Sequence, residues 1–156
     1  YGDLQSNAGN REIRRMIGDE AMAIKVDPRC RYTKTHEWVR VDGEYAYTGI
    51  TDYAQQQLSD IVFVEVPEIG DTFSKGEVYG VVESVKAASD CYMPIGGEIA
   101  QVNEELEDSP ELVNRDPYGD GWFVKFIVED PDELEGLMDA KKYTEYVRRT
   151  MEEGEH

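Results

Sequence analysis

The strongest constraint on the fold is a series of short strand-like runs, each ended by glycine, proline or aspartate. The clearest are Ile61–Val66 and Trp122–Val128, which are rich in β-branched and aromatic residues. Asp42-Gly43 separates two further runs and is a strong signal for a tight hairpin. Long strands do not alternate with long helices, and neither GxGxxG nor GxxxxGK[ST] occurs. The pattern therefore favours a small β-sandwich or barrel over a nucleotide-binding Rossmann unit.

The remaining segments predict more strands and a few short helices. Further strands are expected over residues 78–84, 91–94 and 97–102, with a turn over 71–76 and a loop over 116–121. Helix signals occur in four places: Thr51 to about Ser59, one turn opened by Ser109-Pro110, a capped start at Asp130-Pro131, and a last helix after Asp139. The tail from Glu152 to His156 is expected to fray.

The first 31 residues differ in character from the rest of the chain. Their basic and acidic side chains nearly balance, whereas the whole chain has a net charge of −18. They lack the apolar core of a secretory signal and hold too many acids for an organellar transit peptide. Ile13, Met16 and Ile17 favour a short helix over residues 11–24, and Met22 is a plausible natural start. We predict that residues 1–31 are an extension, weakly structured or partly helical, and that residues 32–156 form the main domain, with helices at its C-terminal end.

Charge and cysteine content exclude several function classes. A strongly negative chain repels nucleic acid and anionic membranes and would favour partners with basic docking faces. On charge alone we favour the simpler interpretation that an acidic surface keeps a small protein soluble. No apolar stretch is long enough to cross a bilayer. Cys30 and Cys91 form no CxxC motif and no metal-ligand pattern with His36 or His156, and the acidic loop 116–121 lacks the spacing of an EF-hand. We expect no metal site, no disulfide scaffold and a reducing cytoplasm.

Lys86 is the residue whose surroundings point to chemistry. It lies in Glu83-Ser84-Val85-Lys86-Ala87-Ala88-Ser89-Asp90, with strand-like residues on both sides and small residues directly after it. Such a segment can hold the amine in water at a hairpin tip, within reach of a modifying enzyme. An ordinary surface lysine is the alternative that these residues alone leave open.

The segment around Lys86 resembles the lipoylation site of glycine cleavage H proteins. The resemblance covers about residues 32–150, in order and without large gaps. The other segments that carry it are Tyr32-Thr33-Lys34-Thr35-His36-Glu37-Trp38-Val39, Gly49-Ile50-Thr51-Asp52-Tyr53-Ala54-Gln55, Gly76-Glu77-Val78, Ser109 to Trp122, Pro131-Asp132-Glu133-Leu134 and the closing tyrosine-rich helix.

This resemblance implies a fold, a cofactor and a set of site residues. The fold is a mainly β barrel-sandwich hybrid, two small antiparallel sheets as in lipoyl domains, with short, mostly C-terminal helices. The cofactor is lipoic acid in amide linkage to Lys86. The hairpin recognised by the lipoyl-attaching enzyme comprises Glu83, Ser84, Val85, Ala87 and Asp90. The resemblance places Glu37 and Asp90 near a cleft for the loaded arm, and Thr35 could add a hydroxyl acceptor there.

The resemblance also implies a non-catalytic carrier role. The lipoyl arm receives an aminomethyl group from glycine decarboxylase (the P protein), passes it to an aminomethyltransferase (the T protein), and is reoxidised by dihydrolipoyl dehydrogenase (the L protein). Tethering raises the effective concentration of the arm at each site that it reaches. A monomer is expected.

Two alternatives stay open at this point. One is an H-like lipoate protein that serves another pathway or donates lipoyl groups to other carriers. The other is an enzyme that uses Lys86 as a Schiff-base nucleophile, which needs a desolvated lysine. Biotin carriers usually place Met on both sides of the lysine, and lipoyl domains of 2-oxoacid dehydrogenases usually place Asp before it, so Val85 favours the H-protein family. His36 has no nucleophile partner in a recognised order and is expected to pack or hydrogen-bond, while Trp38 and Trp122 are expected to anchor the core or loops.

Overall fold

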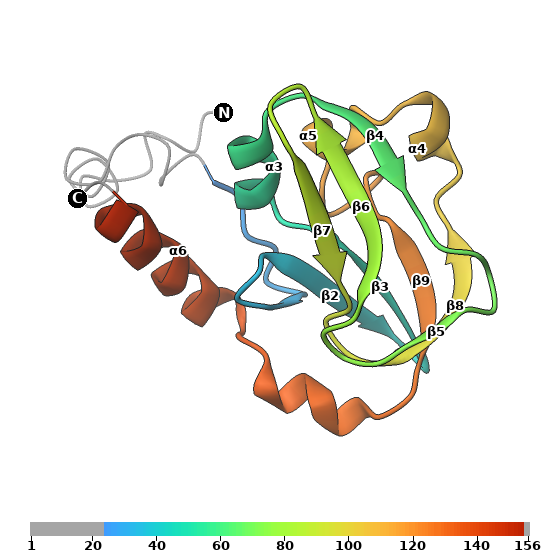
Figure 1. The fold of residues 1–156 in the computed structure, drawn as a ribbon. Helices are drawn as coiled ribbons and strands as arrows, with labels where there is room; N and C mark the ends of the chain where they lie inside the picture. The colour runs from blue at the N-terminus through green and yellow to red at the C-terminus, as the bar shows by residue number, and fades with distance from the viewer. Residues whose placement is uncertain (1–23, 155–156) are drawn as a thin grey trace.

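The computed structural model describes residues 24–154, which form two packed antiparallel sheets with short helices around them (Figure 1). The larger sheet has six strands in the order β1-β2-β3-β9-β8-β5, and the smaller has three in the order β4-β6-β7. The strands are β1 Arg31–Tyr32, β2 Glu37–Asp42, β3 Tyr45–Ile50, β4 Ile61–Glu65, β5 Thr72–Phe73, β6 Val78–Ser84, β7 Ala88–Tyr92, β8 Gly97–Val102 and β9 Val124–Val128. The helices are α3 Asp52–Leu58, α4 Glu105–Asp108, α5 Leu112–Arg115, the 3-10 helix η2 Pro131–Gly136 and α6 Ala140–Gly154. The predicted fold class is confirmed.

The sandwich core lies between the inner faces of the two sheets. The larger sheet contributes residues such as Val39, Ile99 and Phe126, and the smaller contributes Val82 and Cys91; all are at most 1% exposed. In β8 and β9, buried residues alternate with more exposed ones, as expected for a sheet with one solvent-facing side. This packing holds the β6–β7 hairpin, which carries Lys86, on a rigid base.

A second apolar cluster fixes helix α6 against the larger sheet. Tyr143 of α6 is fully buried and stacks on Tyr32 of β1 with a ring-centroid distance of 4.4 Å. The fully buried Trp38 belongs to the same cluster, and its indole nitrogen donates to the Pro117 carbonyl at 3.0 Å. Trp122 packs edge-to-face on Tyr47. The anchoring roles expected for both tryptophans are confirmed.

Several turn and cap predictions hold in the structure. Asp42 and Tyr45 pair across the β2–β3 turn, and Gly43 there has φ 68°, a conformation that glycine adopts without strain. Thr51 caps α3 by accepting from Ala54 N at 3.2 Å. Asp139 accepts from Lys142 N at 2.8 Å at the start of α6.

Other predicted boundaries are wrong. The helical turn predicted after Ser109-Pro110 is present as α5, but it begins at Leu112 rather than at Pro110. Ser109 ends the unpredicted helix α4, with its N–H bonded to the Glu105 carbonyl. The expected turn over 71–76 contains the short edge strand β5, which pairs with β8. The strand predicted from Trp122 begins at Val124, and β7 begins at Ala88 rather than at Cys91. The helix at Pro131 is a 3-10 helix, and α6 continues through Glu152 to Gly154, so the expected fraying does not begin at Glu152.

The described part of the predicted extension contacts the domain. The Lys25 N–H donates to Asp52 at 2.8 Å, and Cys30 is 2% exposed. The helix expected over residues 11–24 falls almost wholly outside the described residues, and the division at residue 31 remains a prediction.

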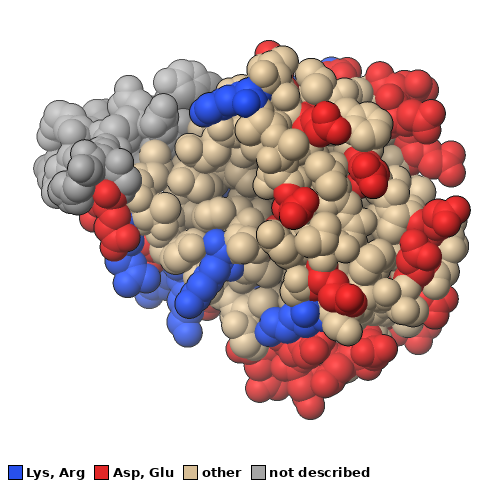
Figure 2. All heavy atoms as spheres, in the orientation of Figure 1, with Lys and Arg blue, Asp and Glu red and all other residues tan. Residues whose placement is uncertain are grey.

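Acidic side chains are spread over the face drawn in Figure 2 and are densest at its lower edge, in the region of η2, whereas basic side chains lie mainly toward its left. Within residues 24–154, no helix has the length and apolar character needed to cross a membrane.

Candidate functional site

Lys86 lies at the exposed tip of the β6–β7 hairpin, as predicted. Glu83 pairs with Ala88, and the Ser84 N–H donates to the Ala87 carbonyl at 2.8 Å, which leaves Val85 and Lys86 at the centre of the turn. Val85 is 69% exposed and Lys86 is exposed. The Lys86 Nζ donates to the Gln57 carbonyl at 3.2 Å, and no ion pair involves Lys86 within the described chain. The amine is therefore accessible to a modifying enzyme.

The Ser84 hydroxyl orders this turn. Its oxygen accepts from the N–H groups of Lys86 at 3.1 Å and of Ala87 at 3.0 Å. The hydroxyl also lies 3.0 Å from the Ala87 carbonyl, to which it donates. Neither Val85 nor Lys86 has the positive φ of the usual two-residue hairpin turns, which glycine favours. The hydrogen bonds of the Ser84 hydroxyl therefore help to stabilise this turn without glycine. The Val85 N–H donates to the Asp60 carbonyl at 3.0 Å, which ties the tip to the start of β4.

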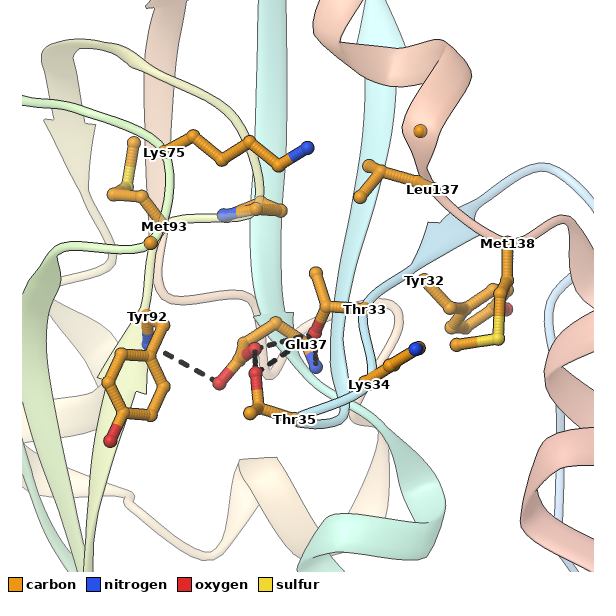
Figure 3. A pocket seen from close by; sticks show the side chains of 13 residues that line it. Tyr32, Thr33, Lys34, Thr35, Glu37, Lys75, Tyr92, Met93, Leu137 and Met138 are labelled. Atoms are coloured by element: carbon orange, nitrogen blue, oxygen red, sulfur yellow. Dashed lines mark hydrogen bonds between the residues drawn. The ribbon is translucent and has the colours of Figure 1, made fainter. Parts of the chain in front are cut away.

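A pocket of about 360 Å³ opens where the two sheets meet η2 and the start of β2 (Figure 3). Its walls combine a buried acid, two threonine hydroxyls, two lysines and several apolar side chains. The lining residues are Tyr32, Thr33, Lys34, Thr35, Glu37, Lys75, Gly76, Tyr92, Met93, Pro94, Gly136, Leu137 and Met138.

Glu37 is the buried acid of this pocket and is 2% exposed. Its carboxylate accepts from the Thr33 hydroxyl at 2.7 Å, from the Thr35 hydroxyl, and from the Tyr92 N–H at 3.3 Å. Burial raises the pKa of Glu37, and the hydrogen bonds from Thr33 and Thr35 oppose that rise. The carboxylate can therefore bind a cationic group, because a positive charge would stabilise a negative charge that water no longer solvates.

The turn before β2 explains the placement of Glu37. Thr33 accepts from the Glu37 N–H at 3.0 Å, and its own N–H donates to the Glu37 carbonyl at 3.0 Å. His36 closes the turn with φ 72°, which is rare for a residue with a side chain. Its Nδ1 lies 2.9 Å from the Tyr143 hydroxyl, and burial lowers the pKa of His36 to about 4. The expected packing and hydrogen-bonding role of His36 is confirmed.

The structure brings some of the predicted site residues together and leaves one apart. Thr35 and Glu37 line the pocket, whereas Asp90 is exposed and does not line it. Asp90 lies on β7 between the Lys86 turn and Tyr92, and since alternate strand residues share a face, its side chain is on the face of Ala88 and Tyr92. At about 3.3 Å per residue, that face runs about 13 Å from Ala88 to Tyr92. The strand β7 therefore leads from the lysine toward the acid.

Sequence reasoning missed several pocket residues. Thr33, two residues before Thr35 and four before Glu37, was detectable from this alternate spacing. Lys75, Met93, Leu137 and Met138 come from distant segments and carry no local signal. Within residues 24–154, no group of three or more His, Cys, Asp or Glu is placed to hold a metal ion.

Comparison with known proteins assigns the family. The model of the family described as "Glycine cleavage H-protein" matches residues 30–150. The chain belongs to the glycine cleavage H-protein family. The family's role, that of the lipoyl carrier in the glycine cleavage system, is accordingly the role of this chain.

Individual relatives agree with this assignment. The glycine cleavage system H protein of Halothermothrix orenii is 52% identical over 124 residues, which are 80% of this chain and 97% of the relative. That of Pseudoalteromonas atlantica is 60% identical over 114 residues, covering 72% of this chain and 88% of the relative. The crystal structure of the H protein from Mycobacterium marinum is similar with a TM-score of 0.67 at 36% identity, over 76% of this chain and 95% of that chain.

Proposed function

We propose that this chain carries a lipoyl group in amide linkage to Lys86 Nζ and that its pocket shelters the loaded end of the arm. The proposal rests on the exposure of the Lys86 amine, which makes no ion pair within the described chain and lies at the tip of an ordered two-residue turn. The lipoyl group supplies a redox-active dithiolane on a long flexible tether, and its sulfur carries the aminomethyl cargo.

The chain's own residues fit this group. The Ser84 hydroxyl presents Lys86 in one turn conformation, and β7 leads from that turn to Glu37. The Glu37 carboxylate offers an acceptor to the cationic amine of the cargo, next to the Thr35 hydroxyl. Met93, Leu137 and Met138 supply an apolar wall that limits the access of water to the bound cargo. Asp90 lies along the path as a second acid on the outer face of β7.

The proposed partners are the P, T and L proteins and a lipoyl-attaching enzyme. An acidic surface such as that of Figure 2 complements partners with basic docking faces. The proposal includes a non-catalytic role, because the exposure of Lys86 is unlike the desolvated setting of a Schiff-base lysine.

Intact mass measurement tests the attachment. The chain is expressed together with a lipoyl-attaching enzyme, and we expect one lipoyl increment that fragmentation places on Lys86. The Lys86→Arg variant keeps the charge and should show no increment. An increment that persists in Lys86→Arg, or that falls on another lysine, would refute the assignment.

The rate of cargo loss tests the pocket. Glu37→Ala and Glu37→Gln should release the aminomethyl group by hydrolysis faster than the wild type, because the amine loses its charged acceptor. Glu98→Ala removes an exposed acid of β8 and serves as the matched control. If hydrolysis in both Glu37 variants proceeds at the wild-type rate, Glu37 does not hold the cargo.

A further inference from the structure

The pocket has a second charged end that the proposed function leaves unused. Lys75 lines the pocket, and Figure 3 draws its ammonium on the far side of the pocket from Glu37. Among residues 24–154, the Lys75 side chain makes no hydrogen bond and no ion pair. An unpaired ammonium on the wall of a pocket is available to an anionic ligand.

The backbone next to Lys75 is fixed to the pocket wall. The Gly76 N–H, directly after Lys75, donates to the Met93 carbonyl at 2.8 Å, and Gly76 has φ 86°. The Lys75 Nζ lies 3.4 Å from the position that a Cβ on Gly136 would take, so it rests against the end of η2. The loop that carries Lys75 is thus joined both to the end of the small sheet and to the helix that closes the pocket.

Two adjacent residues of the pocket wall contact the segments that carry the two charged ends. The N–H of Tyr92 is bonded to the Glu37 carboxylate, and the next residue, Met93, pairs with Gly76 beside Lys75. Met93, Leu137 and Met138 also line the pocket and contribute apolar side chains. The pocket therefore offers a carboxylate for a cationic group, apolar side chains, and an ammonium for an anionic group. One small ligand could contact all three.

This arrangement matches the end of a loaded dihydrolipoyl arm, so the inference rests on the proposed function. Such an end carries a cationic aminomethyl group on one sulfur and a free thiol on the other. We infer that Lys75 binds the second sulfur as a thiolate while Glu37 binds the aminomethyl cation. The thiol releases its proton to solvent, the Lys75 ammonium keeps its own, and no electrons are transferred.

Lys75 would then help the pocket distinguish the states of the arm. The oxidised dithiolane has neither a cationic group nor an ionisable thiol, so neither Glu37 nor Lys75 gains a charged partner from it. The loaded arm provides a cationic partner for Glu37 and an anionic partner for Lys75.

The thiol titration of the loaded protein tests this assignment. The lipoylated chain is reduced and then loaded without partner enzymes by condensation with formaldehyde and ammonia, which forms one C–S and one C–N bond and releases one water. Thiolate absorbance in the ultraviolet is followed against pH. Burial raises the pKa of Cys30 to about 12 and raises that of Cys91 further, so neither thiol interferes at neutral pH.

The expected result is a lower thiol pKa in the wild type than in Lys75→Met. A partly solvated ammonium is worth about one pH unit here, which is about a tenfold larger thiolate fraction at a given pH below both pKa values. Lys75→Arg should titrate like the wild type, because it retains the charge. Lys141→Met removes an exposed lysine of α6 and should also titrate like the wild type.

Other outcomes overturn the inference. A wild-type titration in Lys75→Met, or an equal shift in Lys141→Met, would show that Lys75 does not contact the sulfur. A shift in Lys34→Met alone would assign the contact to the other lysine of the pocket wall, whose side chain points away from Glu37 in Figure 3. Absence of lipoyl on Lys86 would instead refute the proposed function, and the mass measurement reports that before any titration.

Discussion

Replacing Ser84 with alanine should slow lipoyl attachment measurably at a small cost in global stability. The hydroxyl makes three contacts at the turn, to Lys86 N, Ala87 N and the Ala87 carbonyl, at 3.0–3.1 Å. Each is exposed, so we take the low end of the usual net contribution, about 0.5 kcal/mol per bond, or about 1.5 kcal/mol in all. Because about 1.4 kcal/mol corresponds to a factor of ten, the ordered turn becomes up to about tenfold less favoured.

If the attaching enzyme recognises the ordered turn, its apparent affinity falls with the population of that turn. The assay is kcat/KM for lipoylation of the apo chain, followed by intact mass, and we expect a fall of up to about tenfold in Ser84→Ala. Ser84→Thr keeps the hydroxyl and should retain most of the rate. Urea unfolding should change by no more than about 1.5 kcal/mol, because the loss is confined to an exposed tip.

Ser89→Ala is the matched control on the same hairpin. Its hydroxyl makes one long contact, 3.4 Å to the Asp90 carbonyl, so its removal should leave the lipoylation rate near that of the wild type. Wild-type kinetics in Ser84→Ala, or an equal loss in Ser89→Ala, would show that hydroxyl ordering of the turn does not govern recognition of Lys86.

Two further predictions concern stability. Tyr143→Phe should lower the free energy of unfolding by about 1–3 kcal/mol in urea titrations, because it leaves His36 Nδ1 without its hydroxyl partner, whereas Tyr146→Phe removes an exposed bond and should cost less than about 1 kcal/mol; equal losses would contradict this. For Glu37, a pKa raised on folding means that the native state holds the proton more tightly than the unfolded state, so wild-type stability should fall as pH rises from about 4 through the raised pKa. Glu37→Gln lacks this carboxyl and should become more stable relative to the wild type across that range in urea titrations at successive pH values; parallel pH profiles of the two proteins would refute the raised pKa.

The turns and helix starts could be predicted from the sequence because their signals are local, whereas the two-sheet fold and the role of Lys86 were predicted from the resemblance to the H-protein family. Asp42-Gly43 marks a turn through the φ that glycine permits, and Thr51 marks a helix start through a hydroxyl that satisfies a free N–H. The boundaries at Ser109 and Trp122 were wrong because tertiary contacts decide them: Ser109 is used to end α4, and the Phe123 N–H bonds to the Thr48 carbonyl outside the regular ladder.

The pocket was only half predictable for the same reason. Thr35 and Glu37 were identified from the resemblance, and their hydrogen bond is a contact between residues two apart. Lys75 and Met138 reach the pocket from turns that lie far from Glu37 in sequence, and only the packing of η2 against the sheets brings them there. The burial of Glu37 likewise depends on the packing of both sheets, and a charged residue at the start of a strand does not predict that burial.

The bond between Glu37 Oε2 and the Tyr92 N–H joins the first residue of β2 in the six-stranded sheet to the last residue of β7 in the three-stranded sheet. A ligand that binds the Glu37 carboxylate must share its Oε2 with the Tyr92 N–H or displace that hydrogen bond. The backbone amide of Tyr92 therefore reports on ligand binding: its NMR chemical shift should change when the pocket is occupied. This shift can be followed without attaching a label to the arm.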